Sequence, residues 1–241
     1  MIRRGPAAAS RILGLVEDQR NSAAPGQGTV PEPWNHNVHY HRVIIDSIPP
    51  GCARALDVGC GTGALTRRLR QFVPHVTGVD RDERSIELAG AHPGAEDIGY
   101  LLADFLASPF EPESFDLITS IASLHHMDAK AALIRMRDLL RPGGVLAVIG
   151  LARGISPAEI VLVVPAAVGN QLHRAASTRQ RRGAAGRAAA AYQPPVVWPP
   201  PLTYRDTRRL AARLLPGVRY RRRLYWRYSL VWAKPAEHPR A

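Results

Sequence analysis

The chain has 241 residues, 46% of them hydrophobic, so it can bury the core of one α/β domain of ordinary size without disulfides or metals. Only two cysteines occur, Cys52 and Cys60, which excludes a disulfide framework and predicts free thiols in a reducing, cytoplasmic compartment. The apolar run at residues 12–16 is too short for a signal peptide or a membrane span, so no membrane-spanning segment is expected.

The formal charge of +12 is unevenly distributed along the chain. Residues 1–150 hold 15 basic and 17 acidic side chains, whereas residues 151–241 hold 17 basic and 3 acidic ones. One interpretation is a GC-rich coding bias, which favours arginine together with alanine, glycine and proline, and 30 of the 32 basic residues are arginine. An anionic partner of the C-terminal third, such as a carboxylate, a phosphate or a nucleic acid, is the alternative. We favour the first interpretation and keep the second open.

Residues 1–33 show proline and glycine pairs and no sustained period, so we expect a flexible N-terminal arm. Residues 34–241 are expected to form a single domain. Within it we expect a core at 34–151, a basic lid or insertion at 152–217 and a terminal β-hairpin at 218–233. The first predicted helix of the core runs from Asn35 to Ile48, where Pro49-Pro50-Gly51 ends it.

The core then alternates strand-like and helix-like segments with short connections. Strands are predicted at Arg54–Val58, His75–Val79, Gly99–Leu102, Phe115–Ser120 and Val145–Leu151. Helices are predicted at Ala64–Phe72, Asp82–Ala91 and Ala129–Leu140, the last of them ended by the Arg-Pro-Gly-Gly segment 141–144. Near the C-terminus a capping box at Thr203–Asp206 opens a helix through Leu215, and Val218–Arg223 and Tyr225–Trp232 form an antiparallel hairpin. This alternation predicts an α/β fold with a parallel, doubly wound, Rossmann-like sheet.

A glycine-rich turn, Gly59-Cys60-Gly61-Thr62-Gly63, follows the first predicted strand. Residues without a Cβ let the backbone approach a ligand closely. The turn satisfies the pattern that holds the pyrophosphate of a dinucleotide, and it equally suits S-adenosylmethionine (SAM), a nucleoside–amino acid that carries no phosphate.

Three carboxylates at consecutive strand ends favour SAM. Asp57 precedes the turn, Asp80 ends the second strand, and Asp104 follows the third strand directly and is followed by Phe105. Asp57 would repel a pyrophosphate but would attract the sulfonium and ammonium groups of SAM. A carboxylate at Asp80 can accept from ribose hydroxyls, and one at Asp104 can accept from the adenine amino group.

The segment Ala55–Gly63 resembles the signature glycine motif of class I SAM-dependent methyltransferases, and later segments follow in that family's order. These segments are Val79-Asp80, Ala103-Asp104-Phe105, Phe115-Asp116-Leu117-Ile118 and Leu140-Arg141-Pro142-Gly143-Gly144. The resemblance covers about 100 residues and is closest to the broad small-molecule subgroup that includes ubiquinone and menaquinone C-methyltransferases. It implies a seven-stranded sheet in the order 3-2-1-4-5-7-6, with strand 7 antiparallel.

The resemblance also implies roles for individual residues. Gly59, Gly61 and Gly63 would shape the loop around the methionine moiety, and Asp57 would orient it. Asp80 would hold the ribose, with Arg81 beside it among the cofactor-binding residues. Asp104 and Phe105 would hold the adenine, and the backbone near Ser120 would take the methionine ammonium.

The acceptor is approached by elimination. The chain lacks an Asn/Asp-Pro-Pro-aromatic element after the fourth strand, a cysteine nucleophile there, and the lysines of ribose O-methyltransferases. These absences favour a small-molecule acceptor, which the basic C-terminal third allows to be anionic. His125 and His126 lie where a general base could face the methyl group, and a structural role for this His-His pair is the favoured alternative.

The histidines at 36, 39 and 41 do not predict a metal site, because position 41 leaves the helical face that the other two share. Instead we expect residues 34–41 to fold over the cofactor pocket, with Tyr40 or His41 contacting SAM or the substrate. Trp198 lies in the basic lid and is a further candidate for substrate contact.

Four functions remain in competition. A small-molecule methyltransferase leads, and an RNA- or protein-directed methyltransferase that uses the basic C-terminal third is the runner-up. A SAM-binding protein without catalysis and an NAD enzyme follow.

Overall fold

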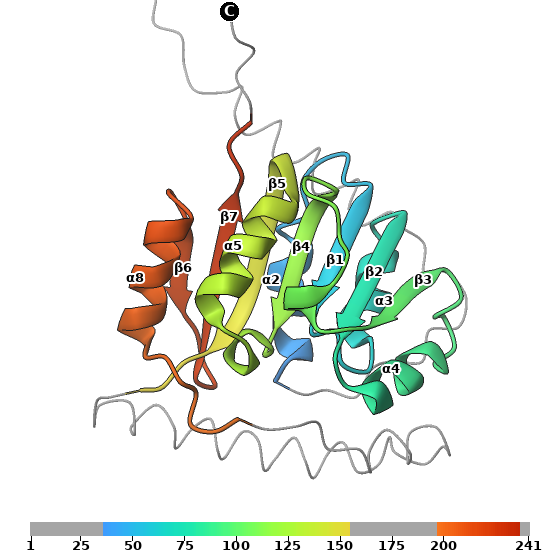
Figure 1. Cartoon of the computed structure of the whole chain (residues 1–241), viewed down its shortest axis with the longest axis horizontal. Coiled ribbons are helices and arrows are strands. Elements are labelled where there is room, and N and C mark those ends of the chain that lie inside the picture. Colours follow the sequence, from blue (N-terminus) through green and yellow to red (C-terminus); the bar gives the residue numbers. More distant parts are fainter. Residues whose placement is uncertain (1–35, 155–196, 237–241) are drawn as a thin grey trace, which may run out of the picture. The chain divides into compact units, whose positions relative to one another are not determined.

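The computed structural model describes residues 36–154 and 197–236, and Figure 1 shows their arrangement. The chain divides into two units, residues 1–31 and 32–241, and every described element belongs to the second unit. The expected N-terminal arm and most of the expected lid at 152–217 lie outside the described residues. Among the described residues, no helix has the length and apolar character needed to cross a bilayer.

The described part of the chain forms one seven-stranded sheet in the order β3-β2-β1-β4-β5-β7-β6, which confirms the predicted topology. All neighbouring pairs from β3 to β5 are parallel, and β7 is antiparallel to both β5 and β6. The strands are β1 (Arg54–Val58), β2 (His75–Asp80), β3 (Ile98–Leu102), β4 (Phe115–Ile121), β5 (Leu140–Leu151), β6 (Arg219–Arg222) and β7 (Arg227–Ala233).

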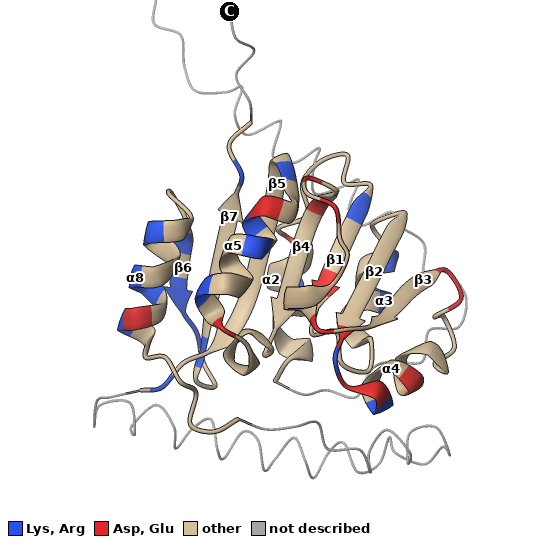
Figure 2. Cartoon of the chain, viewed as in Figure 1, with Lys and Arg blue, Asp and Glu red and all other residues tan. Residues whose placement is uncertain are grey.

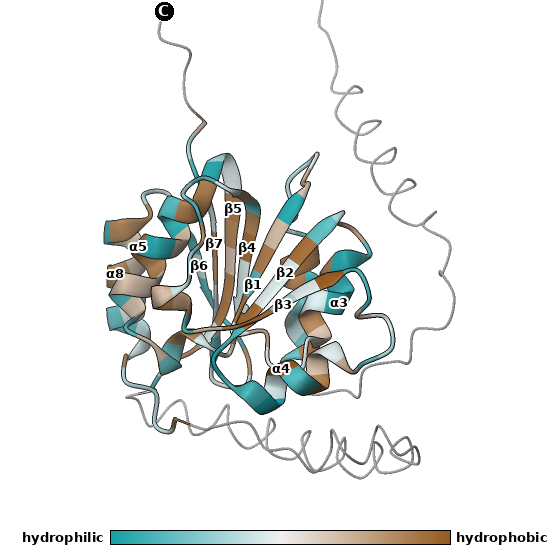
Figure 3. Cartoon of the chain, turned by 45° about the vertical axis from the view of Figure 1, so that its right-hand side comes forward, coloured by the Kyte–Doolittle hydropathy of each residue, from teal (hydrophilic) through white to brown (hydrophobic). Residues whose placement is uncertain are grey.

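Helices cover both faces of the sheet, because successive residues of the central strands point to opposite sides. Leu56 of β1 belongs to a core cluster with Met136, whereas the adjacent Ala55 belongs to a second cluster with Leu69. The first cluster seats α5 (Ala129–Leu139) and α8 (Tyr204–Leu214), and the second seats α2 (His41–Ile45) and α3 (Ala64–Arg70). Figure 3 shows α5 and α8 on one side of the sheet and α3 on the other. Helix α4 (Glu83–Gly90) packs on β2 and β3.

The structure differs from the prediction before β1 and between α5 and β5. The helix expected from Asn35 to Ile48 is a 3-10 turn, η1 (Val38–Tyr40), followed by the short α2. Residues 141–144 do not separate a helix from a strand, because β5 begins at Leu140 and passes through them with a register shift against β4. The Asp116 carboxylate holds this region: it accepts from the Arg141 guanidinium at 2.9 Å and from the backbone N–H groups of Ala53 and Arg54 at 2.9 and 2.8 Å.

The terminal hairpin determines what reaches the carboxyl edge of the parallel strands. Its turn uses Tyr225 and Trp226 in the left-handed region, at φ 57° and 56°, so β7 starts two residues later than the predicted strand. Because β7 is antiparallel, its first residue, Arg227, pairs with Leu151 at the end of β5. The predicted capping box is confirmed: the Thr203 hydroxyl accepts from the N–H of Asp206 at 3.1 Å and donates to its carboxylate at 2.6 Å.

Gly150 on β5 should not tolerate a side chain. Its position opposite Tyr228 leaves no space, since an added Cβ would overlap the Tyr228 ring. We expect Gly150→Ala to lower the free energy of unfolding by about 1–3 kcal/mol, the usual penalty of overpacking. Urea denaturation measures this loss.

Gly90→Ala is the matched control, because an added Cβ at this last residue of α4 meets nothing within 4 Å. Alanine is the better helix former, so the control should be unchanged or more stable by up to about 1 kcal/mol. Equal losses in the two variants would contradict the packing of β7 on β5.

Candidate functional site

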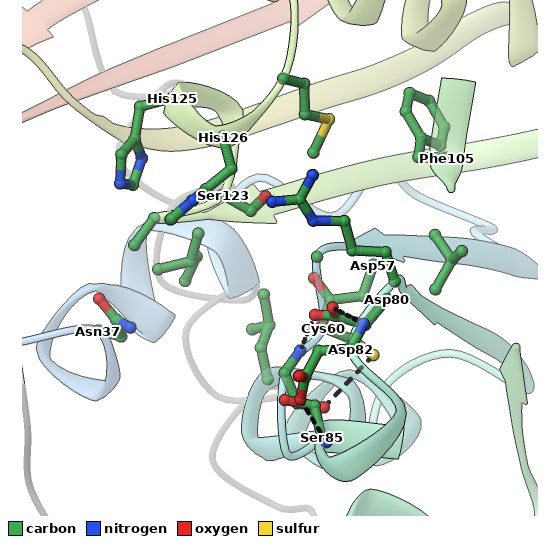
Figure 4. A pocket seen from close by; sticks show the side chains of 18 of the residues that line it. Asn37, Asp57, Cys60, Asp80, Asp82, Ser85, Phe105, Ser123, His125 and His126 are labelled. Atoms are coloured by element: carbon green, nitrogen blue, oxygen red, sulfur yellow. Dashed lines mark hydrogen bonds between the residues drawn. The ribbon is translucent and has the colours of Figure 1, made fainter. Parts of the chain in front are cut away.

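A cavity of about 700 Å³ lies at the carboxyl edge of the parallel strands, within the size range of small-molecule and cofactor sites. Segments that follow β1, β2, β3 and β4 line it, together with residues before α2 and the first residue of β7. In Figure 4 the carboxylates of Asp57, Asp80 and Asp82 gather in one part of the cavity and the rings of His125 and His126 lie in another. The cavity therefore has an acidic part and a part lined by histidines.

The backbone of the glycine turn forms part of the cavity wall. Gly59, Gly61 and Gly63 have φ values of 70°, 53° and 77°, which side chains other than glycine's rarely adopt. An added Cβ at Gly59 would overlap the Ser123 side chain, whereas at Gly61 it would meet no protein atom within 4 Å. Gly59 and Gly61 line the cavity, but Gly63 does not: it begins α3 and packs against Tyr100.

Asp80 ends β2 and connects it to the glycine turn. One of its carboxylate oxygens accepts from the N–H of Gly61 at 2.8 Å, and the other accepts from the N–H of Asp82 at 3.0 Å. These two backbone donors orient the carboxylate at the cavity wall, where Arg81 also lies. Each carboxylate oxygen keeps a further lone pair for a ligand hydroxyl.

Asp104 and Phe105 line the cavity beyond β3, as the sequence places them. Asp104 caps the 3-10 helix η2 (Phe105–Ala107), because its carboxylate accepts from the N–H of Leu106 at 2.9 Å. The Phe105 ring is 4% exposed and has the Arg135 guanidinium 5.6 Å from its centre. Arg135, which belongs to α5, also donates to the Phe105 carbonyl at 2.9 Å. Helix α5 thus holds the Phe105 ring in place.

Asp57 is the deepest of the carboxylates, 2% exposed at the end of β1. The hydroxyls of Thr66 and Thr119 donate to its two oxygens at 2.8 and 3.0 Å. Burial raises the pKa of the Asp57 carboxyl to about 6, and the two hydroxyl donors oppose this shift only in part. Ionised Asp57 therefore favours any cation that enters the cavity beside it.

After β4 the chain turns into the cavity at Ala122, whose φ is 54°. Ile121, Ala122 and Ser123 line the cavity, but Ser120, the predicted residue, does not. The Ser120 hydroxyl is buried against that of Ser123 at 2.5 Å, and Ser123 in turn donates to the Val58 carbonyl at 2.8 Å. The residues of this segment that line the cavity thus lie one to three positions beyond Ser120.

His125 and His126 form the 3-10 helix η3 (Leu124–His126) and line the cavity, with ring centres 4.1 Å apart. The pKa of His125 is lowered to about 4, mainly by burial and in addition by electrostatic interaction with His126 and Arg227. Burial also lowers the pKa of His126. The Nδ1 atom of His125 is buried without a hydrogen-bond partner. Both rings are therefore neutral at physiological pH.

Of the residues predicted to contact substrate, one lines the cavity and two do not. His41 lines the cavity, but Tyr40 points into the core, 4% exposed, where its hydroxyl donates to the Leu224 carbonyl at 2.9 Å. Trp198 is 59% exposed and packs edge-on against Trp226, 6.2 Å away, without lining the cavity. Tyr40 and Trp198 are thus not part of the cavity lining, and their contact with substrate stays a prediction.

Several polar residues of the cavity wall were missed by sequence reasoning, and two of them contact each other. Asn37 and Arg227 line the cavity, and the Arg227 guanidinium donates to the Asn37 side-chain oxygen at 2.5 Å. No motif marks them, because they are 190 residues apart and only the antiparallel β7 brings them together. Cys52 and Cys60 are unpaired, as predicted, and burial raises the pKa of the Cys60 thiol.

Comparison with known proteins identifies the class that this fold and site define. Residues 56–148 match the family model described as a methyltransferase domain. An uncharacterized methyltransferase of Mycobacterium bovis is 34% identical over 205 residues, which span 85% of this chain and 98% of that protein. A ubiquinone biosynthesis O-methyltransferase of Stutzerimonas stutzeri is 34% identical over 116 residues, 45% of this chain and 50% of the relative.

Among solved structures, a SAM-dependent methyltransferase from Methanosarcina mazei shares the fold, with a TM-score of 0.54 at 16% identity. The similarity covers 81% of this chain and 98% of that one. Together with the strand order and the glycine turn, these similarities show that the chain belongs to the class I SAM-dependent methyltransferase family. The chain is therefore a methyltransferase, and SAM is its cofactor.

The buried Asp57 should make stability and cofactor affinity depend on pH. Because its pKa is raised on folding, the native state binds the extra proton between pH 4 and 6, and stability from this group falls as pH rises through that window. The loss is about 3 kcal/mol, from a shift of about two pKa units. We expect Asp57→Asn to gain stability relative to the wild type from pH 4.5 to pH 8, as measured by urea denaturation.

Affinity for SAM should change in the opposite sense, since only ionised Asp57 attracts the cationic cofactor. Calorimetric titration with SAM should show wild-type affinity rising between pH 5 and 7, and Asp57→Asn should bind more weakly without this rise. Asp97→Asn is the control for removal of a surface charge, because its side chain is 76% exposed. If the difference in SAM affinity between the wild type and Asp57→Asn stayed constant across pH, the assignment of Asp57 as the ionising group beside SAM would be wrong.

Proposed function

We propose that the cavity binds SAM in its acidic part and a small-molecule acceptor in the part lined by the histidines, and that the methyl group passes between them. The observation that carries this proposal is the division of a single cavity. Asp57, Asp80, Asp82 and Asp104 lie at or just beyond the ends of β1, β2 and β3, while His125, His126 and Arg227 come from the segment after β4 and from β7. One further carboxylate of the lining, Asp128, lies after the histidines and caps α5. Because β4 lies between these groups in the sheet, the two ligands would meet above its end.

The residues present fit SAM. Its sulfonium and ammonium groups are cations, and the acidic part offers carboxylates without a cluster of phosphate-binding arginines. The open space where a Cβ of Gly61 would lie lets a ligand rest on the turn. We assign the ribose to Asp80, the adenine to Asp104 and Phe105, and the methionine end to Asp57 and the backbone at Ala122 and Ser123.

The chemistry demands little of the protein beyond alignment. When bound, SAM supplies an electrophilic methyl group on a good leaving group, and the acceptor must approach the carbon from the side opposite the sulfur. The chain's own contribution is to position both ligands and to exclude water. His125, which is half-buried, and Met127 line the cavity on the acceptor side.

A small-molecule acceptor fits better than a macromolecule. The arginines of α8 and β6, which Figure 2 shows in blue, are exposed and do not line the cavity. A relative named as an O-methyltransferase of ubiquinone biosynthesis supports an acceptor of modest size. An RNA- or protein-directed enzyme would instead use this basic surface, and its partner binding would weaken steeply with salt.

Two measurements test the proposal. Isothermal titration should show binding of S-adenosylhomocysteine (SAH) and none of NAD, because NAD brings a pyrophosphate next to Asp57. Tritium from methyl-labelled SAM, incubated with the protein and a cell extract, should appear in the small-molecule fraction. Label in RNA or protein would favour the macromolecular alternative, and absence of label with intact SAH binding would indicate a binding protein without catalysis.

Replacement of the histidines tests whether they act as bases. A neutral His125 of pKa about 4 is a weak base, so we propose that the two rings pack against the acceptor. His125→Gln and His126→Gln should then lower kcat/KM by about tenfold or less, mainly through KM, and should leave SAH affinity unchanged. A loss of kcat by about 10²-fold or more, the usual size of a general-base contribution, would instead identify a catalytic base.

A further inference from the structure

Arg227 is a buried cation that has no carboxylate partner in the described part of the chain. It is 7% exposed, and its guanidinium donates to the Tyr225 carbonyl at 3.0 Å and to the Asn37 side-chain oxygen at 2.5 Å. Its Nε is buried with no hydrogen-bond partner. A guanidinium held this way carries its full charge against two neutral oxygens.

Burying an uncompensated charge is unfavourable, and proteins rarely do so without a paired group. Burial lowers the pKa of Arg227 to about 10, and the positive charge of Arg227 helps to lower the pKa of His125. At physiological pH Arg227 is nevertheless a cation. Since no carboxylate of the described residues pairs with it, an anion bound in the cavity would balance this charge.

The position of Arg227 indicates which ligand would supply the balancing negative charge. Arg227 lines the same cavity as the SAM-binding residues, but it lies at the start of β7, beyond β4 and β5 from the carboxylates of β1 and β2. The acceptor, rather than SAM, would therefore face it. Arg81, another arginine of the cavity wall, follows Asp80 at the end of β2, and its charge helps to lower the pKa of His126.

We propose that Arg227 is a specificity-determining residue that binds a carboxylate of the methyl acceptor. A planar guanidinium matches a carboxylate in two parallel N–H···O bonds, and one buried cation balances one negative charge. The neighbouring histidines are neutral and add no second positive charge, so a phosphate dianion fits less well. This inference rests on the proposed function and narrows its acceptor to small carboxylic acids.

Asn37→Asp is the most informative variant. It is nearly isosteric and places a carboxylate where Arg227 now contacts an amide oxygen, so the guanidinium becomes paired within the protein. We expect the variant to unfold at a higher temperature than the wild type and to bind carboxylates at least tenfold more weakly. Arg227→Gln should also lose carboxylate binding. If this second variant fails to fold, Asn37→Asp still decides the question.

The probes are acetate, hexanoate and benzoate, each compared with its neutral amide. Thermal unfolding of the SAH-saturated protein should show stabilisation of the wild type by at least one carboxylate and not by the matching amide. Titration calorimetry then gives the affinity of that carboxylate for the wild type and both variants. SAH affinity should change less than about twofold in Asn37→Asp, since the substitution lies away from the cofactor.

The outcomes separate this inference from the function on which it rests. If the wild type does not bind SAH, the proposed function fails. If SAH binds but no carboxylate stabilises the protein more than its amide, or the effect persists in Asn37→Asp, the role of Arg227 is wrong and the methyltransferase function stands. Stronger stabilisation by phenyl phosphate than by benzoate would overturn the choice of a carboxylate.

Discussion

The antiparallel insertion of β7 between β5 and β6 is the constraint on which the acceptor side of the site depends. Parallel strands bring only their carboxyl ends to the ligand-binding edge. A reversed strand brings its amino end there, so Arg227, the first residue of β7, lies beside Leu151 at the end of β5. Residues from near the two ends of the described chain, Asn37 and Arg227, thereby line the same cavity as the glycine turn.

Two buried charges at the cavity, those of Asp57 and Arg227, reduce the stability of the free protein. In the described part of the chain, Asp57 accepts from two hydroxyl groups, and the guanidinium of Arg227 donates to a carbonyl and an amide oxygen. Among the described residues neither side chain is paired with an opposite charge, and under the proposed function each would face a ligand group of opposite charge. The free protein is less stable for it, and ligand binding recovers that stability.

Much of this arrangement could be predicted from the sequence. Short apolar runs between helical segments gave the strands, and Asp57, Asp80 and Asp104 followed as residues at their ends. The burial of Asp57 could not be predicted, because it depends on Thr66 from α3 and Thr119 from β4. Arg227 was missed because an arginine in a basic hairpin is usually solvent-exposed. Its burial arises from pairing with β5, which local sequence does not encode.

The arginines of β6, the edge strand of the sheet, affect how copies of this protein can associate. Strand β6 contributes Arg219, Arg221 and Arg222 to that edge, followed by Arg223, while helix α8 adds further arginines nearby. An unpaired strand edge is a template for sheet extension between molecules. Two such edges brought together would oppose rows of guanidinium groups, and this repulsion protects the hairpin from fibril-like association.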